Sequence, residues 1–263
     1  MLHYTDAISL LMHDIVQRVP DLSHVAMDRV LVFARHGRHG ACGPNATCHA
    51  IGLPPTEPGY YFWTDAETGV MTRRTPWFVS RWPEVVVDGR AISYLISLNL
   101  PRFAQQPGTR KRQRYFDLPP WVCRLDTIVH ELFHIAPTGC GIREMTRPDG
   151  RLDGRSHPPA FFDAVELLVR EYLATGPDPA VLAVVRDDLA TLADTHGRVC
   201  ATTFRRYPSY PQRYMEVLSQ QPVGPDVPIE PLPSARIPAR YTDGDIVTRD
   251  ITALVVTTSR RAA

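Results

Sequence analysis

The sequence feature that most restricts the fold is the stretch from His130 to His134, which reads His-Glu-Leu-Phe-His. The segment around it has the apolar spacing of a buried helix, carried by Val122, Leu125, Ile128, Val129, Leu132 and Phe133. Pro119 and Pro120 can occupy its first turn. Pro137 and Gly139 can end it. The fold must therefore bury most of one helix and still keep two histidines together on one face.

This spacing suits a zinc site. Positions i and i+4 of a helix lie on one face about 5–6 Å apart, so His130 and His134 can reach a single Zn²⁺. Glu131 can act as general base and accept a proton from a zinc-activated water. Chance would give this pattern in roughly 1% of chains with this His and Glu content. The alternative is a structural helix with two core histidines and a surface glutamate.

A catalytic zinc site needs a third protein ligand and one open position. His157 is the first candidate, because it begins the next predicted helix, which can pack across the zinc helix. Glu166 and Asp163 lie further along that helix and compete with it, since a carboxylate can complete a site with two histidines. The sequence leaves these alternatives open.

The remaining patterns predict an α+β fold. Helices are expected over residues 4–18, 161–172 and 178–197. Strands are expected over residues 24–35, 47–52, 60–64, 84–88 and 91–100. The Asp88-Gly89 turn predicts a hairpin between the last two strands. We expect a small mixed sheet packed against the zinc helix and further helices.

A change in composition near residue 200 suggests two parts: a catalytic domain over residues 1–200 and a C-terminal extension over residues 201–263. Residues 208–238 hold eight prolines, too many for regular structure, and form either a wrapping extension or a linker. The apolar stretch over residues 246–258 is expected to return a strand or two to the core sheet.

The segment HELFHIAP, with Gly141-Ile142-Arg143 after it, resembles a group of uncharacterised bacterial and phage zinc metallopeptidases. The pattern His157-x-x-x-Phe161 is similar to the H-G-x-x-F element of SprT-like zinc metallopeptidases, with Pro158 in place of the glycine. The four-cysteine zinc ribbon of many SprT-like proteins is absent from the sequence. The order of helices and strands is similar to a minimal gluzincin, and the resemblance covers roughly residues 5–175.

The resemblance implies hydrolysis of peptide bonds. It also implies that strand 91–100 forms the sheet edge nearest the zinc, where an extended substrate would bind through backbone hydrogen bonds. An ordinary core strand is the alternative for this segment. Arg143 and Arg147, just after the zinc helix, are candidates for stabilising an oxyanion.

Composition excludes several classes of protein. The 29 basic and 28 acidic side chains give a net charge of +1, which excludes a strongly basic nucleic-acid binder. Apolar runs are short against the about 20 residues of a bilayer span, so no membrane span is expected. Asp6 and Asp14 interrupt the first apolar stretch, so no signal peptide is expected. The five cysteines favour reduced thiols in a cytoplasmic protein.

The sequence contains two further clusters, one of possible metal ligands and one of basic side chains. Residues 36–49 contain several possible metal ligands, but their spacing suits a glycine-rich loop better than a second metal site: His36, His39, Cys42, Cys48 and His49. Residues 101–116, predicted as a loop, carry five basic side chains: Arg102, Arg110, Lys111, Arg112 and Arg114. A solvated loop is favoured there over a nucleic-acid contact.

Two functions follow from these patterns. The first is a zinc metallopeptidase that acts on a protein or peptide substrate, with Glu131 as general base and zinc held by His130, His134 and His157. The second is a catalytically silent, zinc-stabilised binding or adaptor protein, in which the proline-rich segment 208–238 contacts a partner.

Overall fold

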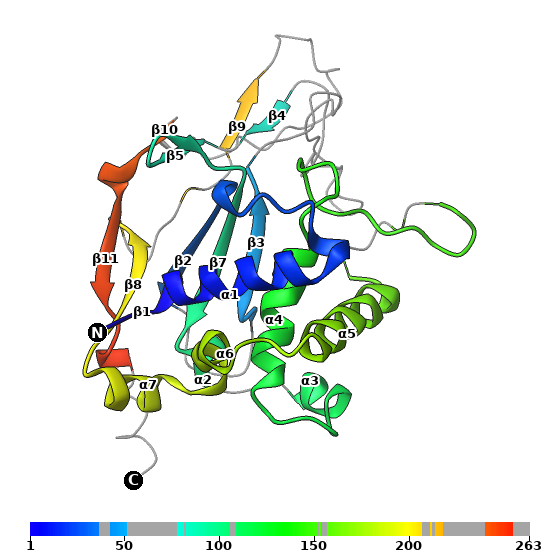
Figure 1. Cartoon of the computed structure of the whole chain (residues 1–263). Helices are drawn as coiled ribbons and strands as arrows, with labels where there is room; N and C mark the ends of the chain where they lie inside the picture. The colour runs from blue at the N-terminus through cyan, green and yellow to red at the C-terminus, as the bar shows by residue number, and fades with distance from the viewer. Residues whose placement is uncertain are drawn as a thin grey trace, which may run out of the picture.

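A three-stranded sheet in the order β2-β7-β3 stands at the centre of the fold (Figure 1). β7 (Tyr94–Leu100) pairs in parallel with β2 (Val30–His36) and antiparallel with β3 (Ala46–Ala50). Helices cover this sheet and smaller sheets flank it, so the fold is mixed α+β, as the sequence predicts. The computed structural model describes residues 1–36, 43–51, 78–81, 83–105, 109–151, 153, 157–206, 211, 214–217 and 240–254.

Both faces of β7 are buried. Tyr94, Ile96, Leu98 and Leu100 face the main apolar core, whereas Leu95 belongs to a smaller core on the opposite face. Ser97 is fully buried as well. Of the two alternatives that the sequence leaves open for strand 91–100, a sheet edge and an ordinary core strand, the structure shows the core strand. Among the described strands, β3 is the outer strand of this sheet on the side of the helix that carries His130.

The predicted hairpin is only partly correct. Asp88 and Gly89 have positive φ angles of 49° and 72° and form the expected tight turn. Only β6 (Arg90–Ala91) continues back along β5 (Glu84–Val87). The chain then leaves this pairing and enters β7, whose two partners come from earlier in the sequence.

Three helices cover the face of the central sheet on which the candidate site lies (Figure 1). α1 (Tyr4–Arg18) crosses the sheet and buries Ile8, Leu11 and Ile15, which confirms the predicted first helix. α4 (Val122–Phe133) packs against β3 and against α5 (Pro159–Ala174). The helices predicted around the His-Glu-Leu-Phe-His motif and from Phe161 to Tyr172 are thus confirmed.

The helix predicted over residues 178–197 is two helices. Asp178 caps α6 (Pro179–Arg186) by accepting a hydrogen bond from the Ala180 N–H at 2.8 Å. Asp188 caps α7 (Leu189–His196) by accepting from the Thr191 N–H at 2.8 Å. The extended backbone of this second cap breaks a single long helix into two.

Residues on both sides of the predicted boundary at 200/201 share one strand. β8 (Val199–Phe204) pairs in parallel with β1 (Leu2–His3) and antiparallel with β11 (Ile246–Asp250). The predicted return of a late strand to the fold is confirmed by β11. The proline-rich segment 208–238 lies outside the described residues except for residues 211 and 214–217, and the predicted strand 60–64 lies outside them entirely.

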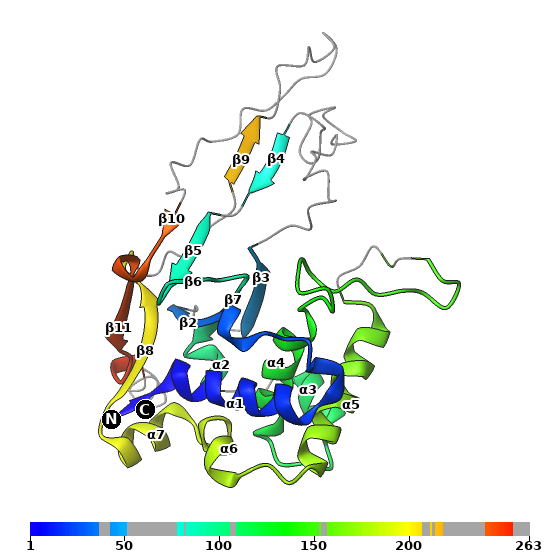
Figure 2. The same cartoon turned by 45° about the horizontal axis from the view of Figure 1, so that its top comes forward.

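Two short strand pairs complete the described structure. β4 (Phe78–Arg81) pairs with β9 (Tyr214–Val217), and β10 (Arg240–Tyr241) pairs in parallel with β5. Figure 2 shows β4 and β9 projecting away from the helices. The candidate site described below lies on the helical side of the central sheet, where α4 packs against β3 and α5.

The basic segment 101–116 is not a simple loop. It contains α2 (Arg102–Gln105) and α3 (Thr109–Arg114). Its described basic side chains bond to the protein: the Arg112 guanidinium, for example, donates to the carbonyl oxygens of Tyr115 and Leu118 at 2.9 and 2.7 Å. The favoured picture of a solvated loop is wrong for these side chains. None of the helices in the described residues has the length and apolar character that a membrane crossing requires.

Candidate metal centre

The last turn of α4 presents His130 and His134 on one side. The helix is regular up to Phe133, and His134 caps it with helical backbone angles (φ −66°, ψ −21°). The His134 N–H also donates to the His130 carbonyl at 3.2 Å. The helix thus ends before the predicted Pro137 and Gly139, yet the i, i+4 geometry that the motif requires is intact.

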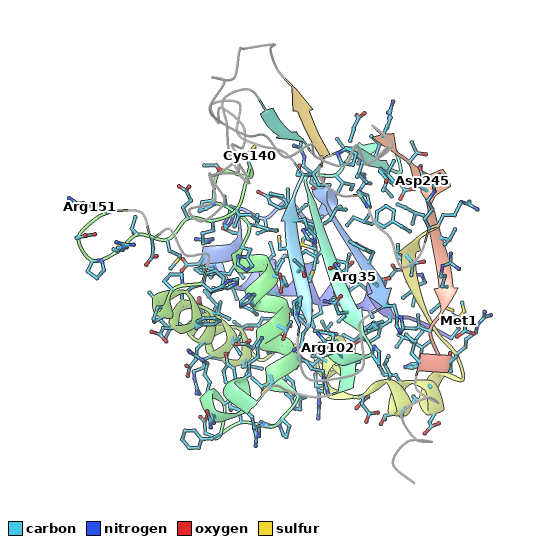
Figure 3. All side chains as sticks on the ribbon, turned by 180° about the vertical axis from the view of Figure 1, so that it is seen from behind. Met1, Arg35, Arg102, Cys140, Arg151 and Asp245 are labelled. Carbon is cyan, nitrogen blue, oxygen red and sulfur yellow. The ribbon has the colours of Figure 1, made fainter. Side chains whose placement is uncertain are left out.

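His157 reaches the same point from the start of α5. Pro158 caps this helix, and Pro159 occupies its first turn, where a missing N–H is tolerated. α4 and α5 pack side by side, with the rings of Phe133 and Phe161 5.0 Å apart in an edge-on contact. The segment between the two helices carries Cys140 near the end of α4 and extends outward to Arg151 (Figure 3).

The three histidine Nε2 atoms form a nearly equilateral triangle. The Nε2–Nε2 distances are 3.1 Å for His130–His134, 3.1 Å for His130–His157 and 3.0 Å for His134–His157. A tetrahedral zinc with bonds of about 2.0–2.1 Å places neighbouring ligand nitrogens about 3.3–3.4 Å apart. The donor set and its spacing therefore fit a zinc ion. Among the described residues, this is the group of histidine, cysteine and carboxylate side chains with a spacing suited to a metal.

The competing ligands Glu166 and Asp163 are occupied elsewhere. Arg114 donates to Glu166 at 3.0 Å and to Asp163 at 3.2 Å, and Arg170 donates to Glu166 at 3.0 Å. Neither carboxylate joins the histidine triangle in the described structure. Of the three alternatives left open by the sequence, His157 is the one that the fold brings to His130 and His134.

Burial keeps the imidazoles neutral. Desolvation, with a smaller contribution from neighbouring charges, lowers the pKa of His130 to about 2 and that of His134 to about 4. Desolvation also lowers the pKa of His157. A neutral imidazole is the form that binds a metal, so the site is ready for a cation at neutral pH.

Glu131 lies between α4 and β3 and is 4% exposed. Burial raises its pKa to about 8, whereas the positive charge of Lys111 and a hydrogen bond from the Cys48 backbone N–H act in the opposite direction. Nearby Asp126 adds a smaller upward effect. The side chain therefore sits next to the outer strand β3, in a setting typical of a carboxyl group that exchanges protons near neutral pH.

Comparisons with known protein families, curated proteins and solved structures give no match. The resemblance to zinc metallopeptidases therefore stays a prediction from sequence.

Among the described residues, the predicted cluster over residues 36–49 does not join the three histidines in a metal group. His39 and Cys42 lie outside the described residues. His36 pairs opposite Leu100 and Cys48 opposite Ile96, which places these two about 13 Å apart along the sheet. The described residues of this cluster thus form no second metal group.

Arg143 and Arg147 have structural contacts. The Arg143 guanidinium donates to the Phe133 carbonyl at 2.7 Å and stacks over the Phe133 ring at 4.2 Å. Arg147 forms an ion pair with Asp153 at 3.6 Å. Arg143 therefore closes the end of α4, a role that the sequence analysis did not assign to it.

Sequence reasoning also missed the support beneath α4. Lys111 forms an ion pair with buried Asp126 and donates to Thr127 at 2.8 Å. The Tyr115 hydroxyl donates to the other oxygen of Asp126 at 2.8 Å. No local pattern links α3 to these positions, because the contact depends on how the two helices pack.

Proposed function

We propose that this protein is a zinc-dependent metallopeptidase. His130, His134 and His157 hold the metal, and Glu131 is the general base. The observation that carries the proposal is the triangle of Nε2 atoms, 3.0–3.1 Å apart, beside a buried glutamate on the same helix. Neutral histidines are the form that binds zinc, and Glu131 follows the first of them on the same helix.

Each residue has a defined task in this proposal. When bound, zinc supplies the Lewis acidity that makes a water molecule nucleophilic at neutral pH. Glu131 accepts the proton and passes it to the amine that leaves. His130 and His134 come from one helix, so the backbone sets the spacing of these two ligands.

The outer strand β3 supports a peptide as substrate. Its Cys48 N–H bonds to Glu131, so the strand runs past the proposed base. In the described sheet β3 pairs only with β7. An outer strand can take up an extended chain through backbone hydrogen bonds. β3, and not strand 91–100, is thus the proposed substrate edge.

The first test is metal content by mass spectrometry. We expect about one zinc per wild-type chain, by analogy with single three-histidine sites. Folded His130→Ala and His157→Ala variants should lose it. Zinc retained in His157→Ala would show that His157 is not the third ligand. A wild-type chain that takes up no zinc even after reconstitution would refute the proposal.

Glu131→Gln separates catalysis from metal binding. The amide is nearly the same size but accepts no proton, so the variant should keep its zinc and lose at least about 100-fold in peptide hydrolysis. Activity is measured on an unstructured protein such as casein. A Glu131→Gln variant as active as the wild type would rule out Glu131 as the general base.

A zinc-stabilised binding protein is the second candidate. The observation that favours it is the 4% exposure of Glu131, which is low for a residue that must meet a substrate. In that case the wild type binds zinc, hydrolyses no protein substrate and unfolds when zinc is removed. We also propose a cytoplasmic location, since the four described cysteines are free thiols.

A further inference from the structure

Two of the three candidate ligands have no hydrogen bond that fixes the orientation of the ring. The Nδ1 atoms of His130 and His134 are shielded from solvent and have no hydrogen-bond partner among the described residues. Histidine ligands usually donate this second ring N–H to a carboxylate, a carbonyl or a water, which fixes the tautomer and the ring orientation. Something else must hold these imidazoles in place.

Phe161 contacts all three imidazoles. Its ring centroid lies 4.9 Å from that of His130, 4.7 Å from that of His134 and 5.1 Å from that of His157. The side chain is fully buried. The neighbouring Phe162 is 37% exposed and contacts His130 and His157 at 6.0 and 5.8 Å. Phe161 thus packs against every candidate ligand of the metal.

The position of Phe161 is itself fixed. Its N–H donates to the Pro158 carbonyl at 3.0 Å, which ties it to the turn that carries His157. Its ring centroid lies 5.0 Å from that of Phe133, and the Arg143 guanidinium stacks over the Phe133 ring at 4.2 Å. A rigid ring therefore connects the end of α4 with the start of α5, which are the two segments that supply the ligands.

We propose that Phe161 is a positioning residue of the metal centre, which packs against the three imidazoles and, for His130 and His134, takes the place of hydrogen bonds to Nδ1. This inference rests on the proposed zinc site. Loss of the ring would free the imidazoles to rotate, and each would then have to be ordered when the metal binds. Metal affinity should fall even though no ligand has been removed.

The test compares Phe161→Leu with two controls in the full-length chain. Phe103→Leu makes the same change at another buried phenylalanine, in α2, where no ring contact with the histidines is found. Leu168→Ala removes buried volume from α5 itself. Zinc affinity is measured by competition with a chelator, the stability of the metal-free protein by urea unfolding, and the ligand geometry by the visible spectrum of bound Co²⁺.

We expect Phe161→Leu to weaken zinc binding about 10–100-fold, the range for the loss of an outer-shell partner, and to change the Co²⁺ spectrum. Both controls should lose stability yet keep zinc affinity within about threefold. Should Phe161→Leu not fold, Phe161→Met replaces it, because the flexible methionine side chain can fill an irregular gap without providing a rigid ring.

Two results would overturn the inference. One is a Phe161→Leu or Phe161→Met variant with wild-type zinc affinity and spectrum. The other is an equal loss of affinity in all three variants, which would reduce the role of Phe161 to general stability. Either result leaves the zinc site of the wild type standing. A wild type that binds no zinc would refute the site and this inference together.

Discussion

The only lysine of the chain has a structural role that its sequence context hides. Lys111 stands among arginines in a segment with the composition of a solvated loop. In the fold its ammonium group forms an ion pair with Asp126, whose side chain is 6% exposed and which lies one turn before His130 on α4. The positive charge of Lys111 therefore neutralises a buried carboxylate on the helix that carries His130 and His134.

Lys111→Met should destabilise the protein. It leaves Asp126 without its cation, while the Tyr115 hydroxyl remains as a donor. Breaking a fully buried pair costs about 3–5 kcal/mol, and we expect about 2–3 kcal/mol here because the lysine is 25% exposed. Urea unfolding at pH 7 measures the change.

Arg198→Met is the matched control, because the ion pair between Arg198 and Asp250 is exposed on both sides. It should leave the midpoint of unfolding unchanged. An equal effect of the two substitutions would mean that the Lys111 pair is no more important than a surface pair.

At the scale of elements, caps decide where helices begin and end. Asp178 as a cap and Gly197 as a stop predict one helix over residues 178–197. The split arises because the Asp188 carboxylate accepts a hydrogen bond from the Thr191 N–H of the next helix. An aspartate in the middle of a helical pattern can be a surface residue or a cap. The packing of α7 selects the cap, and that information is not local.

The cap makes stability depend on pH. The hydrogen bond from the Thr191 N–H lowers the pKa of Asp188 below its ordinary value. A lowered native pKa means that the carboxylate stabilises the fold fully above the unfolded pKa of about 3.9, and that this contribution disappears as pH falls through the native pKa. Asp188→Ala should cost about 1 kcal/mol at pH 7.

Asp188→Asn is the informative partner of that variant, because asparagine caps a helix but does not titrate. Protonation of Asp188 removes the contribution of its charge. The wild type should therefore lose unfolding free energy relative to Asp188→Asn as the pH falls from about 5 to about 3. Urea unfolding at both pH values gives this difference. A difference that stays constant over this range would show that the carboxylate does not act through its charge.

The sequence predicts the turn between β5 and β6 better than it predicts which strands pair. The Asp88-Gly89 turn is correct, because local backbone angles determine it. The partners of β7 are wrong in the sequence analysis, because strand pairing depends on segments that are far away in the chain. Ser97 is polar, yet it is fully buried, on the same side of β7 as Leu95 of the smaller core.

At the scale of the whole molecule, the sequence predicts more of the candidate site than of the strand pairing in the sheet. His130, Glu131 and His134 share one helix, so their spacing alone fixes their geometry. His157 could be proposed because it begins the next helix. Its choice over Glu166 required the ion pairs of Arg114, and the orienting ring of Phe161 required three-dimensional contacts.

The C-terminal part of the chain belongs to the fold. β11 covers one edge of β8, and Ile251 just after it is buried in the main core. A chain ending at Arg206 should therefore be destabilised by several kcal/mol, because an apolar anchor and a row of backbone hydrogen bonds are lost. Circular dichroism and urea unfolding of the purified variant measure the effect.

A chain ending at Leu254 is the control, since it keeps β11 and Ile251. It should unfold like the full-length protein. If the shorter variant is equally stable, residues 207–263 are a separate extension, as the composition suggested.

The pairing of β8 has a consequence for how the protein is made. β1 precedes β8 in the sequence and β11 follows it, and both reach Cys200, which pairs with His3 on one side and Asp250 on the other. β11 leaves the ribosome later than β8, because 41 residues lie between Phe204 and Ile246. Until then β8 keeps a bare edge, where a neighbouring nascent chain could pair. With six residues, that edge is short, which limits such mispairing during synthesis.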